Sequence, residues 1–247
     1  MEQNDLKKTT HRRGFLGVLA AGAAAVGLAS VASPFKLQAQ ATKPARRTSP
    51  AIMPEPTDAK DPADTWMGKI KGRHRIVFDA TRPHEVMPFA WPKVFLLTNG
   101  KTGSPPNDCG VVVVLRHAAI GYAFESKLWS KYNFGEMFEA PDPHDHTGKT
   151  IATSNPFWMP NPKYSIPGVG EVAIGINDLQ ADGVMFCVCD VAMTVYSAVV
   201  ADKMKMKPEE VKKDWMSGLL PGIQVVPSGV WALGRAQENG CQYCFAG

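Results

Sequence analysis

An unbroken run of β-branched and aliphatic residues at 111–115, Val-Val-Val-Val-Leu, is the strongest structural signal in this chain of 247 residues. A strand with one face in water alternates apolar and polar side chains, whereas a strand covered on both faces is apolar throughout. Residues 184–189, Val-Met-Phe-Cys-Val-Cys, have the same character. Such strands are typical of a mainly parallel sheet with helices on both faces, which predicts a three-layer α/β/α fold.

Strand-like and helix-like segments alternate along the folded part, with loops rich in Gly, Pro and Asn between them. Ser228 can cap the last helix, and Gly240 can end it. Residues 135–170 contain six prolines and little periodicity. They are predicted to form a long loop, and loops of this length are often functional. Further strands are predicted at 73–79, 223–226 and 241–245, and helices at 89–97, 118–132, 172–181, 192–206, from Pro208 onward and at 229–239.

The first 41 residues have the order of an export signal, with a charged start, an apolar run and a site for signal peptidase. Arg12 and Arg13 stand directly before the apolar run, which is typical of the twin-arginine route. The alternative is a membrane anchor, because the run of about 19 residues approaches the minimum for a span. Its glycines and the following Ala39-Gln40-Ala41 favour removal instead. We expect export to the periplasm, contact with a membrane only during export, and cleavage near Ala41.

The net charge of +4 comes mostly from this segment. Residues 1–41 carry five Lys or Arg and two Asp or Glu, so the remainder has 22 bases, 21 acids and a net charge of +1. So small a charge indicates no nucleic-acid partner. Residues 42–66 are rich in Pro, Ala, Thr and Lys and are predicted to be a flexible linker. One α/β domain is therefore expected at 67–247.

Reactive side chains follow three of the predicted strands. Arg116 and His117 come after the first, Cys189 ends the second, and Ser228 and Gly229 follow the third. In parallel sheets, ligands bind beyond the carboxyl ends of the strands. If these strands are neighbours, their ends share one rim. Cys189 and His117 are then the catalytic candidates, and Arg116, Ser228 and Gly229 the ligand-binding candidates.

Cys189 has two interpretations. It ends a strand and precedes a helix, whose N–H groups and dipole can stabilise a thiolate. Arg116 and His117 would add positive charge there, while Asp190 opposes it. Alternatively, Cys187 and Cys189 are small buried apolar residues, as free cysteines often are. We expect the second interpretation for Cys187, and the sequence leaves both open for Cys189.

The pair Cys241-x-x-Cys244 has the spacing of a redox dithiol, but it stands in the last seven residues rather than at the start of a helix. A structural disulfide between Cys241 and Cys244 would suit an oxidising periplasm. Residues three apart on a regular strand face opposite sides of the sheet, which opposes this bridge. With five cysteines in the chain, at least one is unpaired.

His144-Asp145-His146 places two imidazoles two residues apart, a spacing that occurs at metal sites. Without further ligands, His144 and His146 are weak metal candidates, and a polar solvated loop is the alternative. The sequence has no glycine-rich phosphate loop, serine-hydrolase elbow or c-type haem motif. It therefore indicates no cofactor.

Two segments carry a family resemblance. Residues 183–193, Gly-Val-Met-Phe-Cys-Val-Cys-Asp-Val-Ala-Met, and 219–230, Leu-Leu-Pro-Gly-Ile-Gln-Val-Val-Pro-Ser-Gly-Val, resemble the cysteine turn and the carboxyl-terminal block of the DsrE/DsrF-like (YchN-like) family. Residues 113–117 also fit its second strand. The resemblance covers roughly 73–132 and 172–247. The long loop and the last two cysteines have no counterpart in it.

The resemblance implies a compact three-layer domain that forms oligomers such as homotrimers or hexamers. It also implies sulfur handling, in which a strand-end cysteine holds sulfur as a persulfide and exchanges it with a sulfur-carrier or redox partner. Here Cys189 occupies that position. An exported protein would not meet cytoplasmic carriers, so a non-catalytic oligomeric module that binds a small ligand stays the alternative. A metal-binding protein using His144 and His146 is the third hypothesis.

Overall fold

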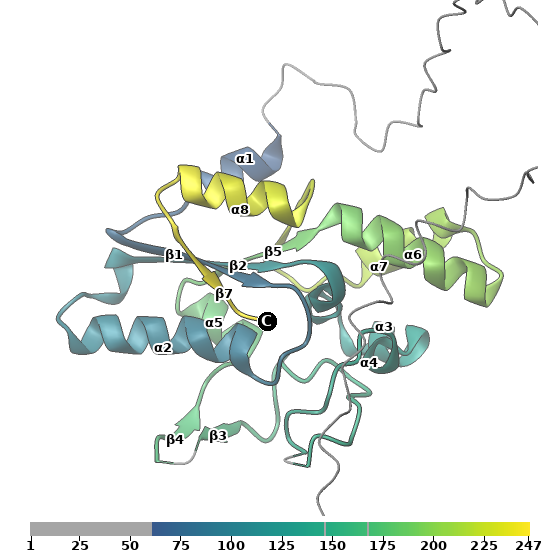
Figure 1. The fold of residues 1–247 in the computed structure, drawn as a ribbon, viewed down its shortest axis with the longest axis horizontal. Coiled ribbons are helices and arrows are strands. Elements are labelled where there is room, and N and C mark those ends of the chain that lie inside the picture. The colour runs from purple at the N-terminus through teal and green to yellow at the C-terminus, as the bar shows by residue number, and fades with distance from the viewer. Residues whose placement is uncertain (1–60, 146, 167) are drawn as a thin grey trace, which may run out of the picture. The chain divides into compact units, whose positions relative to one another are not determined.

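A computed structural model describes residues 61–145, 147–166 and 168–247 (Figure 1). The predicted signal at 1–41 and the predicted linker as far as residue 60 lie outside these residues. A sheet of five parallel strands carries helices on both faces, so the predicted three-layer α/β/α fold is confirmed. The strands follow the order β6, β5, β2, β1, β7 across the sheet. In that order their bounds are Ile223–Val226, Met185–Cys189, Cys109–Leu115, His74–Ala80 and Gln242–Phe245.

Strand β2 lies at the centre of the sheet, between β1 and β5. Val113 and Leu115 belong to the larger hydrophobic core on one face, while Val112 and Val114 belong to a smaller core on the other. All four side chains are fully buried. Alternate residues of a strand point to opposite faces, so an apolar run without interruption is what a central strand requires.

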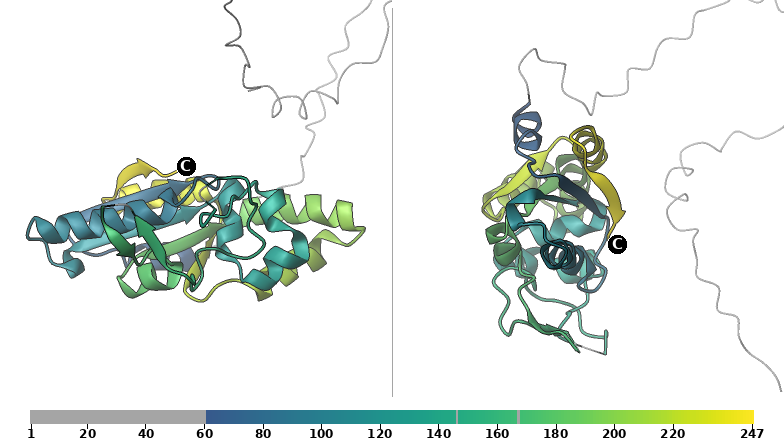
Figure 2. Two further views of the ribbon diagram at one scale, coloured as in Figure 1. Left: turned by 90° about the horizontal axis from the view of Figure 1, so that it is seen from below. Right: turned by 90° about the vertical axis from the view of Figure 1, so that its left-hand side faces the viewer.

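The helices divide between the two cores. Helices α1 and α8 cover one face of the sheet, and α2 and α5 cover the other, as Figure 1 and the right-hand view of Figure 2 show. Helices α6 and α7 pack against each other and contribute to the larger core. The helix bounds are α1 Pro62–Met67, α2 Met87–Lys101, η1 Pro106–Asp108, η2 His117–Ala123, α3 Ser126–Tyr132, α4 Phe134–Met137, α5 Ile176–Ala181, α6 Asp190–Met204, α7 Pro208–Ser217 and α8 Gly229–Glu238.

The predicted single helix at 118–132 is wrong. The chain forms the 3-10 helix η2 and then α3, with an extended break at Phe124 and Glu125. Phe124 pairs in an isolated β-bridge with Leu219, and the Glu125 N–H donates to the Gly218 carbonyl at 2.9 Å. These partners lie some ninety residues further along the chain, so the periodicity of the segment itself does not reveal the break.

The folded part also begins earlier than the predicted boundary at residue 67. Residues 62–66, expected in the linker, belong to helix α1. Asp61 caps this helix, since its carboxylate accepts the Ala63 N–H at 2.8 Å, and Pro62 occupies the first turn. Ala63 and Met67 are fully buried in the smaller core. Their burial, rather than helix propensity, holds so short a helix in place.

The long segment 135–170 is anchored on the larger core by one buried side chain. The Asn155 amide donates to the carbonyls of Tyr122 and Phe124 at 2.9 and 2.8 Å, and its oxygen accepts the Phe157 N–H at 3.0 Å. The Phe157 ring stacks on Phe89 at 4.0 Å between centroids. Further along, β3 (Tyr164–Ile166) and β4 (Gly170–Val172) form a small antiparallel pair.

We predict that Asn155→Ala lowers the free energy of unfolding by about 3 kcal/mol, because it leaves buried backbone groups without partners. Urea unfolding followed by circular dichroism measures the change. The neighbouring exposed residue provides the control, and Ser154→Ala should change stability by less than about 0.5 kcal/mol. Equal effects of the two substitutions would show that Asn155 does not anchor the loop.

Candidate functional site

Side chains from the five strands, or from the residues that follow them, gather towards the carboxyl end of the sheet. We call the set Asp79, Arg116, Cys189, Ser228 and Tyr243 the strand-end site. Asp79 belongs to β1 and Tyr243 to β7, Cys189 ends β5, and Arg116 and Ser228 follow β2 and β6. The register pairs Leu115, the last residue of β2, with Val188 of β5, so that Arg116, the next residue, lies beside Cys189. The predicted neighbourhood of these strand ends is therefore present.

Arg116 is held by a carboxylate that the sequence analysis missed. Its Nε donates to Asp79 Oδ1 at 2.6 Å and its Nη2 to Oδ2 at 2.9 Å, a bidentate pair. The Tyr243 hydroxyl donates to the same Oδ2 at 2.9 Å. Asp79 is 1% exposed. The hydrogen bond from Arg116 to Asp79 raises the pKa of Arg116. The pKa of Tyr243 is raised first by burial and then by its own hydrogen bond to Asp79.

The stem of Arg116 packs against the start of α8. A Cβ atom at Gly229 would lie 2.5 Å from the Arg116 Cβ and 2.7 Å from its Cδ. Glycine at this position is required by the close approach. Ser228, directly before it, caps α8 by accepting the Trp231 N–H at 3.2 Å. Ser228 and Gly229, predicted as ligand-binding residues, thus position the helix and the arginine stem.

Cys189 is the N-cap of α6. Its Sγ accepts the Ala192 N–H at 3.3 Å, and the residue is 6% exposed. Cys189 lies close enough to Arg116 to make a small electrostatic contribution to its raised pKa, after the hydrogen bond and charge of Asp79 and the charge of Tyr243. A backbone donor on the sulfur and a cation nearby are features that favour thiolate chemistry.

The acid that follows the cysteine is neutralised. Asp190 lies in the first turn of α6, where the sequence analysis expected its charge to oppose a thiolate. Lys212 of α7 places its Nζ 2.7 Å from Asp190 Oδ1, and it also donates to Thr194 Oγ1 at 2.9 Å. The ion pair therefore reduces the repulsion between Asp190 and a charged sulfur.

His117, the second predicted catalytic residue, has a left-handed backbone with φ of 49°. Its ring packs edge-on against Tyr196 of α6 with 5.8 Å between centroids. The Tyr196 hydroxyl lies 3.3 Å from the imidazole Nε2. The structure thus joins His117 to α6 through Tyr196, whereas Arg116 is the neighbour of Cys189 that the strand register supplies.

The other cysteines lie in different surroundings. Cys187 is completely buried, and burial raises its pKa strongly. Cys241 belongs to the smaller core and Cys244 packs against the larger one, so they lie on opposite faces of the sheet. Both are free, and the suggested Cys241–Cys244 disulfide is not formed. Burial raises the pKa of Cys241 to about 11.

The suggested histidine metal site has no support in the described residues. The His144 ring stacks on Tyr164 with 4.6 Å between centroids, and its backbone N–H donates to Asp142. His146 lies outside the described residues. Within residues 61–145, 147–166 and 168–247, no group of three or more His, Cys, Asp or Glu is arranged to hold a metal ion.

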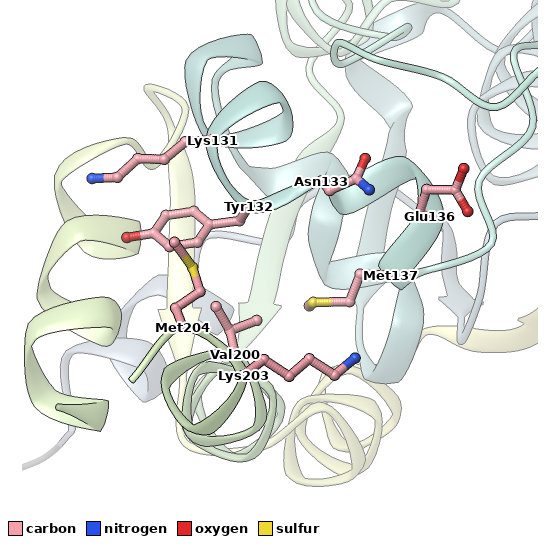
Figure 3. A pocket seen from close by; sticks show the side chains of 8 residues that line it. All are labelled: Lys131, Tyr132, Asn133, Glu136, Met137, Val200, Lys203 and Met204. Carbon is pink, nitrogen blue, oxygen red and sulfur yellow. The ribbon is translucent and has the colours of Figure 1, made fainter. Parts of the chain in front are cut away.

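A surface cavity of about 380 Å³ lies elsewhere, between α3, α4 and α6 (Figure 3). Its α6 residues belong to the second half of that helix, roughly 16–23 Å along the axis from Cys189. Lys131 and the Tyr132 hydroxyl both bond to Asp214, at 2.9 and 2.7 Å. The cavity is therefore separate from the strand-end site. Its lining residues are Lys131, Tyr132, Asn133, Glu136, Met137, Val200, Lys203 and Met204.

The fold and site define an α/β/α protein with a cysteine at the start of a helix and a clamped arginine beside it. No family model matches the chain, and no curated protein matches it at a significant level. A solved structure of a protein of unknown function from Methanobacterium thermoautotrophicum is similar, with 16% identity and a TM-score of 0.36. The match covers 70% of this chain and 98% of that one. Among the described helices, none is long and apolar enough to cross a membrane.

We predict that iodoacetamide at pH 7.5 leaves Cys187 and Cys241 of the folded protein unmodified, because burial excludes the reagent and raises both pKa values. Peptide mass spectrometry after brief exposure measures this, and the urea-unfolded chain should be modified at all five cysteines. With its pKa at about 11, Cys241 should react roughly tenfold faster for each added pH unit. Equal rates for Cys187 in the folded and unfolded chains would contradict the prediction.

Proposed function

We propose that this protein is an exported DsrE-like protein whose Cys189 carries sulfur as a persulfide. The observation that carries the proposal is the position of Cys189, with the Ala192 N–H on its sulfur and Arg116 at the end of the neighbouring strand. Both groups favour negative charge on sulfur, which is the nucleophilic form of a thiol. The ion pair between Asp190 and Lys212 supports the same chemistry by removing an opposing charge.

The transfer step balances without a separate oxidant. The Cys189 thiolate attacks the outer sulfur of a donor persulfide, R–S–SH. A new S–S bond forms to Cys189 as the S–S bond of the donor breaks, and the donor leaves as the thiolate RS⁻, which then takes up a proton from water. The product is a Cys189 persulfide, and sulfur moves on when an acceptor thiolate repeats the exchange.

The resemblance of residues 183–193 and 219–230 to the DsrE/DsrF-like family supports this role, since it implies that Cys189 has the position of the family's sulfur-carrying cysteine. The order of charged start, apolar run and Ala39-Gln40-Ala41 supports action in the periplasm after twin-arginine export. The proposal includes a homo-oligomer and a sulfur-carrier or redox partner that is also exported.

A second candidate function is a non-catalytic oligomeric module that binds a small ligand at the same strand ends. The low exposure of Cys189, 6%, favours it, because a buried thiol meets reagents slowly. Exposed Val195 and Val199 on α6, at 55% and 45%, suit contact with another subunit. The two candidates differ in whether Cys189 accepts sulfur.

We predict that glutathione persulfide adds one sulfur atom to Cys189 of the full chain at neutral pH. Mass spectrometry of the intact protein and of its peptides measures the addition. Cys189→Ser should abolish it, whereas Cys244→Ser, which removes a half-buried thiol away from α6, should leave it unchanged. Absence of sulfur from Cys189 in a folded protein would reject the carrier function and favour the binding module.

A further inference from the structure

We propose that Arg116, clamped by Asp79, which in turn accepts a hydrogen bond from Tyr243, makes the strand-end site select negatively charged sulfur compounds as the substrates of Cys189. The inference rests on the proposed function and adds the class of substrate to it. It assigns Arg116 as the specificity-determining residue, and Asp79 and Tyr243 as the positioning residues that act through it.

The geometry supplies a directed cation beside the reacting sulfur. Leu115 and Val188 are partners in the register of β2 and β5, so Arg116, directly after β2, lies beside Cys189, the last residue of β5. The Arg116 stem is confined by Gly229, where there is no room for a Cβ. The Arg116 side chain is therefore held in one orientation at the strand ends rather than moving freely in solvent.

The clamp leaves part of the guanidinium available. A guanidinium has five N–H donors in a planar fork. Among the described residues, the hydrogen bonds of the Arg116 side chain run from Nε and Nη2 to Asp79. The Arg116 side chain is 27% exposed and that of Asp79 is 2% exposed, so the open part of the pair is the cation. A ligand meets donors there and not the carboxylate.

Neighbouring charges add to this bias. The helices α6 and α8, of 15 and 10 residues, both begin at these strand ends, and helix amino ends favour anions. The Tyr243 hydroxyl donates to Asp79 and so shields the carboxylate. Asp190, the other acid near the cysteine, is paired with Lys212. A small anion that approaches Cys189 thus meets mainly positive potential.

Two alkylating reagents of similar size test the selection. Iodoacetate is an anion and iodoacetamide is neutral, and both react with the same Cys189 thiolate. We therefore divide the rate constant for iodoacetate by that for iodoacetamide. In this ratio the intrinsic reactivity of the thiol cancels, and the charge preference of the site remains. We expect the ratio for Cys189 to be about two- to fivefold higher in the folded chain than in the urea-unfolded chain. Raising the salt concentration from 0.05 to about 1 M should remove most of this difference.

Matched arginine variants locate the effect. Arg116→Gln should return the ratio to the unfolded value, while Arg73→Gln should leave it unchanged, because Arg73 pairs with Asp108 at the amino end of the sheet. Tyr243→Phe should lower the ratio partly, since it loosens the clamp. If Arg116→Gln alone does not fold because Asp79 is left unpaired, the double variant D79N/R116Q removes both charges and serves in its place.

The outcomes separate this inference from the proposed function. If Cys189 of the folded protein reacts with neither reagent and takes up no sulfur, the proposed function fails. If Cys189 accepts sulfur but its ratio equals that of the unfolded chain, or if the Arg116 variants keep the high ratio, the selection of anions fails while the carrier function stands.

Discussion

The burial of β2 on both faces is the constraint on which the rest of the site depends. A strand without a polar side chain over residues 111–115 cannot occupy an edge with one wet face, so it lies between β1 and β5. The first polar residue after it, Arg116, is then flanked by the ends of both neighbours. Asp79 and Cys189 become its partners for that reason.

The ion pair of Asp79 and Arg116 is a costly way to hold an arginine. Removing a carboxylate from water is unfavourable, and a buried pair is often no more stable than apolar residues of the same volume. The pair is satisfied by two short hydrogen bonds and by the Tyr243 hydroxyl, which removes the penalty of an unpaired charge. What the arrangement provides is direction, because a bidentate guanidinium cannot rotate freely.

Much of the fold could be predicted because its signals are local. Apolar runs marked β2 and β5, and a serine followed by glycine marked the start of α8. The sequence did not predict the break at Phe124, because the break depends on pairing with Leu219. It also did not predict the short helix Pro62–Met67, because that helix depends on burial against α8. In both cases a distant contact outweighed the local pattern.

The sequence by itself determined that a cysteine and an arginine stand at the ends of buried parallel strands, since strand ends follow from where apolar runs stop. Only the tertiary structure decided which groups meet there. Asp79 binds both Arg116 and Tyr243 because β1 lies between β2 and β7. Strand order is a long-range property that periodicity does not encode. Cys241 and Cys244 lie on opposite faces, as their spacing of three along the chain predicts, because side chains alternate along a strand. The strand order, by contrast, is what leaves Cys189 beside the clamped cation.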